Sequence, residues 1–263
     1  MRVRGIAPVM ACAPETDGPA LSGSQIDGSH IDWSHIDTWV FDLDNTLYPP
    51  HSKLWPQIDL RITLYLCNLF GLDGLSARAL QKHYYYRYGT TLNGLMAENG
   101  IDPYPYLDFA HDIDLATLEP DPILVQAIDA LPGRKLIFTS GSKRHAANVT
   151  GRLGFENHFE GVFDIVDAGF VPKPAASTYE RFIANHGVDP RRAVMFEDIA
   201  KNLLVPDQMG MRTVLVLPKQ PDPYREQHEQ QPQADSHIHH QTTDLAAFLQ
   251  NLSKAHDLSK DLG

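Results

Sequence analysis

The stretch Trp39-Val40-Phe41-Asp42-Leu43-Asp44-Asn45-Thr46-Leu47-Tyr48 decides the fold of this chain. Its first three residues are bulky and apolar, which predicts a short strand buried on both faces. Two aspartates follow at positions i and i+2, and a buried strand that ends in two carboxylates is costly unless a cation or a reaction requires them. Extended backbone through Asp44 would place both carboxylates on one side of the sheet. An Asx-type turn at Asp44-Asn45 is the alternative, so residues elsewhere in the chain must decide.

Composition limits what the chain can do. With 263 residues, of which 43% are hydrophobic, it can bury one large domain and a smaller one. A net charge of -11 argues against nucleic acid polymers and anionic membranes as partners. The two cysteines, Cys12 and Cys67, form neither a disulfide framework nor a metal cluster. No apolar run reaches the length of a membrane span, so we expect a cytoplasmic protein. The oligomeric state is not readable from the sequence.

Hydrophobic periodicity divides the chain into segments. The first of them is poor in large apolar residues, and its repeat, which ends in Ser34-His35-Ile36-Asp37, has a period of five that matches neither helix nor strand. Between the first strand and the next, the apolar residues recur only at helical spacing, which predicts a helical insertion in an α/β chain. We expect a disordered N-terminal segment at 1–37, a catalytic α/β core at 38–50 and 121–218, a helical cap at 51–120, a polar loop at 219–241 and a docked C-terminal helix at 242–253.

Several local features are also predicted. Further strands are expected at 135–138, 162–166, 193–196 and 213–217, alternating with helices, which is typical of a parallel sheet. Ser76 and Thr243 are expected to cap helices, and Pro174 to lie in the first turn of one. In the polar loop, three histidines are expected to be solvated rather than metal-bound: His237, His239 and His240.

Polar residues follow three of the predicted strands, at the edge where the carboxyl ends of parallel strands meet. They are Asp42 and Asp44, Thr139 and Ser140, and Glu197 and Asp198. Without a counter-charge these carboxylates would repel one another, and Mg²⁺ suits them because it binds a few hard oxygen ligands and shares phosphate oxygens. Lys173, the hydroxyls and the helix after Ser142 predict an anion site. A cation, an anion site and a carboxylate nucleophile together favour phosphoryl transfer through an aspartyl-phosphate.

These motifs, in this order over residues 38–217, resemble the haloacid dehalogenase superfamily, and in particular its phosphatases with a helical cap after the first motif. The resemblance implies an α/β fold whose core is a Rossmann-like parallel sheet. It implies that Asp42 is the nucleophile and that Asp44 is first acid and then base, with its backbone carbonyl on Mg²⁺. The remaining roles are metal binding by Asp198 with Glu197, and phosphate binding by Thr139, Ser140, Gly141 and Lys173.

A closer resemblance is to the pyrimidine 5'-nucleotidase branch of that superfamily. It rests on Phe41 to Tyr48, Tyr88 to Leu95, His111 to Asp114 and Phe196 to Leu203. The branch usually has Thr-Asn-Gly where this chain has Thr139-Ser140-Gly141, so a serine hydroxyl, with a shorter reach, stands in place of the amide donor. The resemblance implies UMP and CMP as substrates. Candidate contacts to the leaving group are Tyr48, Thr90, Thr91 and His111, each of which has a packing, turn or capping role as its alternative.

Other functions stay open at this point. A general phosphatase for a sugar phosphate, phosphoglycolate or pyridoxal phosphate would share every motif. A dehalogenase needs no metal and usually lacks an acid at the position of Asp44, so Asp44 disfavours it. A phosphomutase would share the core, whereas a non-catalytic binding module would be expected to lose one of Asp42, Asp44, Lys173 or Asp198. The leading expectation is a Mg²⁺-dependent hydrolase of small phosphomonoesters.

Overall fold

The computed structural model describes residues 33–220 and 235–260. Its strands are β1 (Thr38–Phe41), β2 (Arg134–Phe138), β3 (Gly161–Phe163), β4 (Ala193–Glu197), β5 (Arg212–Val216) and β6 (His240–Thr242). Its α-helices are α1 (Leu54–Phe70), α2 (Gly74–Tyr88), α3 (Thr91–Asn99), α4 (Pro103–Ala110), α5 (Pro122–Asp129), α6 (Lys143–Leu153), α7 (Ala176–His186), α8 (Leu204–Met209) and α9 (Leu245–Lys260). Short 3₁₀ helices are η2 (Pro50–Ser52), η3 (Pro190–Arg192) and η4 (Ala200–Leu203). Residues 1–32, with Cys12 and most of the repeat, lie outside the described residues.

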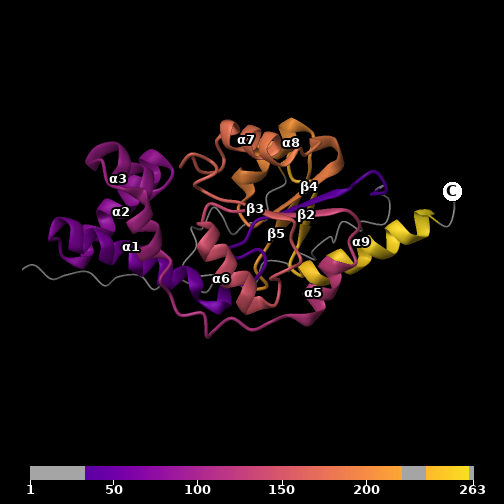
Figure 1. Cartoon of the computed structure of the whole chain (residues 1–263), viewed down its shortest axis with the longest axis horizontal. Helices are drawn as coiled ribbons and strands as arrows, with labels where there is room; N and C mark the ends of the chain where they lie inside the picture. Colours follow the sequence, from indigo (N-terminus) through magenta and orange to yellow (C-terminus); the bar gives the residue numbers. More distant parts are fainter. Residues whose placement is uncertain (1–32, 221–234, 261–263) are drawn as a thin grey trace, which may run out of the picture.

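The described strands form one parallel sheet in the order β3-β2-β1-β4-β5-β6. Helices α7 and α8 cover one face, while α5, α6 and α9 cover the other (Figure 1). The alternation of side chains along β1 serves both layers, because Trp39 and Phe41 join the cluster under α5, α6 and α9, and Val40 joins the cluster under α7 and α8. The predicted α/β fold with a Rossmann-like parallel core is therefore confirmed, and β1 lies at its centre.

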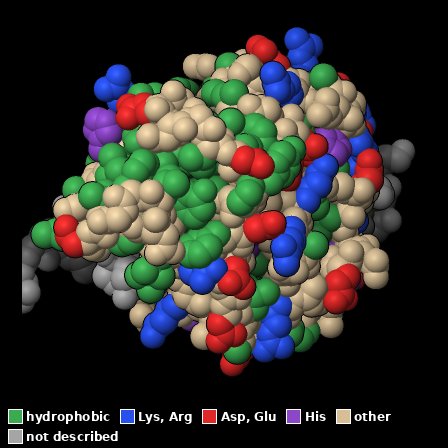
Figure 2. Space-filling view, turned by 60° about the vertical axis from the view of Figure 1, so that its left-hand side comes forward, with side chains coloured by type: hydrophobic (Ala, Val, Ile, Leu, Met, Phe, Trp, Pro, Cys, Tyr) green, Lys and Arg blue, Asp and Glu red, His purple; other side chains and the backbone are tan. Residues whose placement is uncertain are grey.

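Helices α1 to α4 form the cap, which lies beside the sheet (Figure 1). They have a hydrophobic core of their own that includes Leu66, Tyr84 and Leu95. Helix α2 begins at Gly74, with Asp73 Oδ1 accepting from the Leu75 and Ser76 amides, so the prediction of Ser76 as its capping residue is wrong. Figure 2 brings the cap side of the molecule forward and shows hydrophobic side chains gathered over this face.

The prediction of disorder up to residue 37 is wrong for residues 33–37. Trp33 and Ile36 are both 2% exposed and belong to the main hydrophobic cluster. The Trp33 ring lies 5.1 Å from that of His240 and meets Phe248 edge-on at 6.4 Å. Two large apolar side chains in a polar segment are enough to anchor it when a strand and a helix offer them a surface.

The predicted polar loop contains a strand. Residues His240–Thr242 form β6 on the edge of the sheet, and His240 is 2% exposed. His239 Nδ1 lies 2.7 Å from the Thr213 hydroxyl, and His237 Nε2 lies 3.0 Å from the Ala200 carbonyl oxygen. The expectation of solvated histidines is therefore wrong, because these rings hydrogen-bond or pack against the core. Helix α9 then starts at Leu245 with Asp244, rather than Thr243, accepting from the Ala247 amide.

Two predicted boundaries near the site also differ from the structure. β3 ends at Phe163, three residues before the predicted end at Val166, which lies in a turn. Helix α7 begins at Ala176, so Pro174 precedes it instead of lying in its first turn. The chain turns here, with the Ala175 amide donating to the Pro172 carbonyl at 3.1 Å, and the Lys173 side chain reaches from this turn to the sheet edge. Among the helices described, none has the length and apolarity needed to cross a membrane.

Candidate active site

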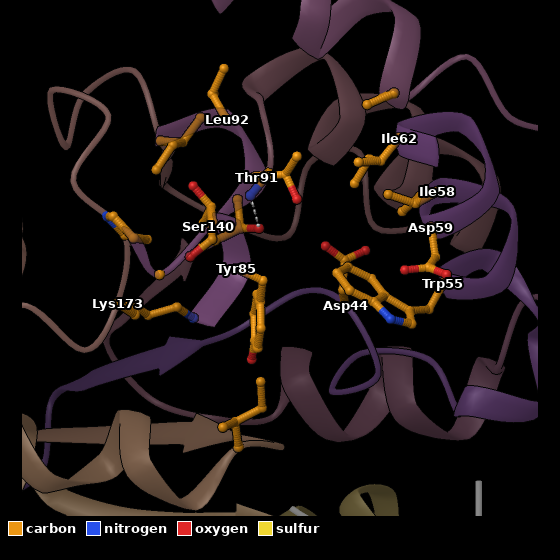
Figure 3. A pocket seen from close by; sticks show the side chains of 18 of the residues that line it. Asp44, Trp55, Ile58, Asp59, Ile62, Tyr85, Thr91, Leu92, Ser140 and Lys173 are labelled. Atoms are coloured by element: carbon orange, nitrogen blue, oxygen red, sulfur yellow. Dashed lines mark hydrogen bonds between the residues drawn. The ribbon is translucent and has the colours of Figure 1, made fainter. Parts of the chain in front are cut away.

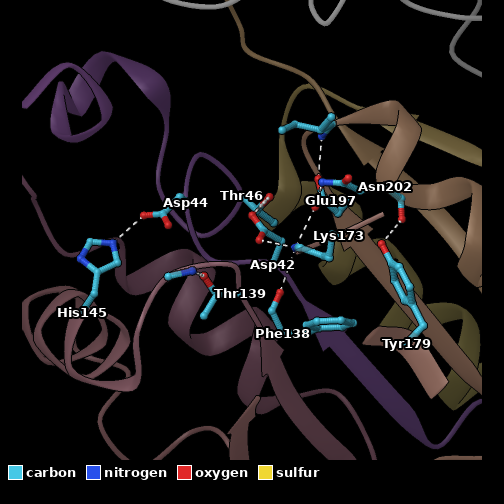
Figure 4. Close-up of polar contacts among 12 residues, drawn as sticks. Asp42, Asp44, Thr46, Phe138, Thr139, His145, Lys173, Tyr179, Glu197 and Asn202 are labelled. Atoms are coloured by element: carbon cyan, nitrogen blue, oxygen red, sulfur yellow. Dashed lines mark hydrogen bonds and ion pairs between the residues drawn. The ribbon is translucent and has the colours of Figure 1, made fainter. Parts of the chain in front are cut away.

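The predicted nucleophile lies at the centre of the carboxyl edge of the sheet. Asp42 follows β1 directly and its amide donates to the Phe196 carbonyl of β4 at 2.9 Å, so the aspartate is held in line with the strand. Lys173 Nζ lies 2.6 Å from Asp42 Oδ1, 2.8 Å from Glu197 Oε1 and 3.0 Å from the Phe138 carbonyl oxygen (Figure 4). An ammonium has three N–H donors, and these three oxygens account for all of them.

Burial and charge set the protonation of this group. Burial raises the pKa of Asp42 to about 7, with repulsion from Glu197 and Asp44 adding to the effect of burial and Lys173 opposing it. Burial alone would raise the pKa of Glu197 too, but Lys173 and hydrogen bonds from the Ile199 amide and Asn202 hold it below its ordinary value. Burial would lower the pKa of Lys173, yet the carboxylates of Asp42 and Glu197 raise it above its ordinary value. The lysine is therefore charged.

A cation fits beside this group. Oxygen atoms of Asp42, Glu197 and Asp198 lie within 4.8 Å of one another, and all three residues are buried. Three carboxylates against one ammonium leave a net negative charge in a buried site, and a divalent cation with oxygen ligands would balance it. The Oδ1 atom of Asn202 is buried without a hydrogen-bond partner among the described residues, while its amide nitrogen donates to Glu197 at 2.7 Å. A hydrated ion could satisfy that oxygen, so the donor set suits Mg²⁺.

The second motif forms a tight turn after β2. The Gly141 amide donates to Thr139 Oγ1 at 2.9 Å, and Ser140 is exposed and lines the pocket (Figure 3). Ser142 then caps α6, with its Oγ accepting from the His145 amide at 3.2 Å. The hydroxyls of Thr139 and Ser140 thus lie next to the N-terminus of an eleven-residue helix, an arrangement that favours an anion.

The second aspartate of the first motif points away from the lysine, toward α6 (Figure 4). Asp44 Oδ1 accepts from the Tyr48 hydroxyl at 2.5 Å and lies 2.8 Å from His145 Nε2. Burial would raise the pKa of Asp44, but His145 and Tyr48 together lower it to about 2. The side chain of Asp44 is thus not one of the three grouped carboxylates, and Tyr48 and His145 hold it apart from them.

Sequence reasoning missed three residues of this site. Thr46 Oγ1 donates to Asp42 Oδ2 at 3.2 Å, Asn202 supports Glu197, and His145 contacts Asp44. The sequence contains one signal for His145: a histidine three residues after a helix cap, on the same buried face as Ala146 and Val149. The other two contacts span a turn or a 3₁₀ helix and have no periodic signal.

A pocket of about 260 Å³ lies between the sheet edge and the cap. Of the predicted leaving-group residues, Thr90, Thr91 and His111 line it and Tyr48 does not. The hydroxyls have other partners: Thr90 accepts from the Asn93 amide, Thr91 donates to the Gln81 carbonyl, and Tyr48 bonds to Asp44. Aromatic side chains of the cap also belong to the lining: Trp55, Tyr85 and Tyr106. Figure 3 shows Trp55 and Tyr85 at the pocket.

Known proteins are similar to this chain in sequence or in fold. A curated relative, "Phosphate metabolism protein 8" of Saccharomyces cerevisiae, is 27% identical over 193 residues, which is 67% of this chain and 60% of that protein. Among solved structures, the HAD phosphatase from Thermococcus onnurineus is similar with a TM-score of 0.55 at 17% identity, covering 82% of this chain and 98% of that one. An L-2-haloacid dehalogenase from Xanthobacter autotrophicus is similar with a TM-score of 0.50 at 19% identity and the same coverage. At these identities the two structures show the fold alone.

The sequence profile of haloacid dehalogenase-like hydrolases matches residues 36–205, a span that holds the cap and every motif residue of the site. With its sheet order, the cap and the grouped carboxylates of Asp42, Glu197 and Asp198, this chain belongs to the haloacid dehalogenase-like hydrolase family.

Proposed function

We propose that this protein is a Mg²⁺-dependent phosphomonoester hydrolase that works through an aspartyl-phosphate on Asp42, and that its substrates are pyrimidine nucleoside 5'-monophosphates. The observation that carries the hydrolase is the contact of the buried Lys173 with Asp42, beside a group of three carboxylates that calls for a cation. The name of the yeast relative, a phosphate metabolism protein, agrees with phosphate chemistry. Because the fold is shared with dehalogenases, the support comes from the site.

The chemistry follows from the residues in place. A carboxylate oxygen of Asp42 bonds to phosphorus while the bond from phosphorus to the leaving oxygen breaks, and Asp44 gives that oxygen a proton. The phosphoryl dianion brings negative charge next to Asp44. This charge raises the pKa of Asp44 from the low value that His145 and Tyr48 impose, so that the carboxyl group can carry the proton that it gives. A water molecule then attacks phosphorus, Asp44 takes its proton, and phosphate leaves with the Asp42 carboxylate restored.

The phosphoryl oxygens need positive charge and donors. Lys173 stays charged and touches the nucleophile, and the hydroxyls of Thr139 and Ser140 lie at the start of α6. Asp42, Asp198 and Glu197, with the backbone carbonyl of Asp44, would hold Mg²⁺. When bound, this ion neutralises and orients the phosphoryl oxygens for attack.

The cap side of the pocket supports a planar leaving group. Trp55 and Tyr85 line it together with apolar side chains that include Ile58, Ile62 and Leu92. One aromatic ring of a base could stack there, and stacking of a base on an aromatic side chain contributes about 1–3 kcal/mol. A purine is larger and would hold the cap open, which admits water and displaces Asp44. The cytoplasmic location expected from the sequence stays a prediction.

Phosphate release tests both levels of this proposal. The substrates are UMP, CMP, AMP, GMP, ribose 5-phosphate and phosphoglycolate, each with Mg²⁺ and with a chelator. We expect turnover only with Mg²⁺, none in Asp42→Asn, and kcat/KM for UMP at least about tenfold above that for AMP. A ratio near one would reduce the proposal to a general phosphatase. Full turnover with the chelator would refute the phosphatase chemistry.

Two variants test the base contact. Tyr85→Leu and Trp55→Leu should each lower kcat/KM for UMP by about 5- to 150-fold, the loss of one stacking contact. Activity on ribose 5-phosphate, which has no base, should change little. Tyr86→Leu is the matched control, because Tyr86 is 65% exposed on the same helix and is not part of the pocket lining. Equal losses on both substrates would contradict the role of the aromatic side chains.

A further inference from the structure

Only one of the two carboxylate oxygens of Asp44, Oδ1, has hydrogen-bond partners among the side chains of the described residues. Oδ1 accepts from the Tyr48 hydroxyl at 2.5 Å and lies 2.8 Å from His145 Nε2. An ionised carboxylate can only accept, so His145 Nε2 carries a proton and donates it into this contact. Burial and the neighbouring Asp44 raise the pKa of Tyr48 well above its ordinary value, so its hydroxyl also stays a donor. Two donors on Oδ1 leave Oδ2 as the oxygen for a leaving group or a water molecule.

His145 is itself fixed in place. Its side chain is fully buried in the first turn of α6, on the face that Ala146 and Val149 pack into the core. Its backbone amide donates to Ser142 Oγ at 3.2 Å. This N-terminal capping bond of α6 fixes the backbone position from which the His145 side chain extends. Its Nδ1 atom is buried and has no hydrogen-bond partner among the described residues. The buried imidazole of His145 therefore has one polar contact among the described residues, and that contact is with Asp44, the proposed acid.

A residue of the helical cap packs against the ring of His145. His111, which ends the cap helix α4, stacks on His145 with ring centroids 4.4 Å apart and planes 16° apart. Burial and the neighbouring His145 lower the pKa of His111 to about 3, so this ring is neutral. The Ser142 hydroxyl, 3.2 Å from His111 Nδ1, has one hydrogen to donate to it. The same serine thus contacts the ring of His111 and the backbone amide of His145.

We infer that His145 is a positioning residue for Asp44, and that His111 of the cap holds His145 in place, so that the acid is aligned in full only when the cap is docked. The inference rests on the proposed function. A carboxylate with Tyr48 as its only donor can swing about its side-chain bonds, and proton transfer depends on the alignment of the donor with the leaving oxygen. His145 touches neither substrate nor metal in this scheme and acts through Asp44.

The test distinguishes a defect in proton transfer by Asp44 from a general loss of activity or folding. His145→Phe keeps a ring against His111 but removes the donor, and His145→Gln restores an N–H donor without the ring. Each variant is assayed with UMP, whose alkoxide leaving group needs a proton, and with 4-nitrophenyl phosphate, whose leaving group does not. We expect His145→Phe to lower kcat/KM for UMP by about 10²-fold, to change that for 4-nitrophenyl phosphate far less, and His145→Gln to recover most of the loss.

Further variants make the test robust. Tyr48→Phe removes the other donor and should show the same selective loss, which keeps the test valid if His145→Phe does not fold. Arg144→Ala is the matched control, since Arg144 precedes His145 on α6 and also bridges to the cap, at Asp108, but on the exposed surface. It should leave the ratio of the two substrates unchanged.

The outcomes can be told apart. An equal loss on both phosphates, or no loss, in His145→Phe and in Tyr48→Phe would overturn the inference and leave the proposed function standing. No recovery in His145→Gln would also overturn it. A wild-type protein that hydrolyses neither phosphate in the presence of Mg²⁺ would refute the proposed function, and the inference would fail with it.

Discussion

Replacing Lys173 by methionine removes one charge from a buried group of four. Methionine keeps an unbranched apolar side chain, so the change is mainly one of charge. The lysine side chain is 2% exposed and contacts Asp42 at 2.6 Å and Glu197 at 2.8 Å. Removing one partner of a buried ion pair costs about 3–5 kcal/mol, because the remaining charge is left buried without compensation. With total stabilities of about 5–15 kcal/mol for folded domains, the variant should fold but be much weakened.

The pH dependence has a definite sign. In the metal-free wild type, burial raises the pKa of Asp42 to about 7, so its contribution to stability is greatest at low pH and is lost as pH rises from about 4 to 7. Without Lys173, Asp42 and Glu197 lose the cation that lowers the pKa of each. The free energy of unfolding of Lys173→Met should therefore fall more steeply than that of the wild type between pH 5 and pH 8.

Magnesium should oppose the defect. An ion that binds only the folded state adds about 2.7 kcal/mol when its free concentration is 100 times Kd, and the variant has no ammonium competing for the same carboxylates. Urea unfolding at pH 7.5, with a chelator and with Mg²⁺, measures both effects. Lys143→Met is the control, because its ion pair with Asp167 is exposed and should contribute less than about 1 kcal/mol. A loss below 1 kcal/mol in Lys173→Met, or equal stabilisation of both proteins by Mg²⁺, would refute this reasoning.

Three further predictions concern other parts of the chain. Asp44→Asn should lose about 10²–10⁴-fold in kcat/KM for UMP but much less for an aryl phosphate, and equal losses would argue against its role as the acid. Burial lowers the pKa of His240 to about 4, so the free energy of unfolding should fall as pH drops from about 6.5 to 4, and His240→Phe should remove that part of the pH dependence in denaturant titrations. Trp33→Ala should cost about 3–5 kcal/mol in the same assay while kcat stays unchanged, because Trp33 packs on His240 and Phe248, outside the pocket lining; a change below 1 kcal/mol would show that the 33–37 anchor is not needed.

Much of the core could be predicted because its signals are local. A run such as Trp39-Val40-Phe41 can be buried only as a strand between two layers, and parallel strands bring their carboxyl ends to one edge whatever the helices between them do. Asp42, Lys173 and Glu197 could therefore be placed together without any knowledge of distances. The errors lie where a few side chains outweigh the average of a segment: Trp33 and Ile36 in a polar stretch, and His240 in a histidine-rich one.

The environment of the proposed acid, Asp44, shows most clearly what cannot be predicted from the sequence. Asp44 and His145 are 101 residues apart in the sequence. Their contact depends on the turn after β2, on Ser142 as the N-terminal capping residue of α6, and on the rotation of α6 about its axis. None of these leaves a repeating pattern in the sequence. The stacking of His111 on His145 depends further on how the cap lies against the core.

The sequence by itself determined the order of the strands from β1 to β5, the place of the helical insertion and the identity of the four motifs, because burial patterns and strand-end chemistry act over a few neighbouring residues. Only the tertiary structure decided which oxygen of Asp44 is held, which aromatic side chains of the cap reach the pocket, and that β6 completes the sheet. These depend on packing between segments distant in the chain, where a shift of one turn or one register changes which side chains meet.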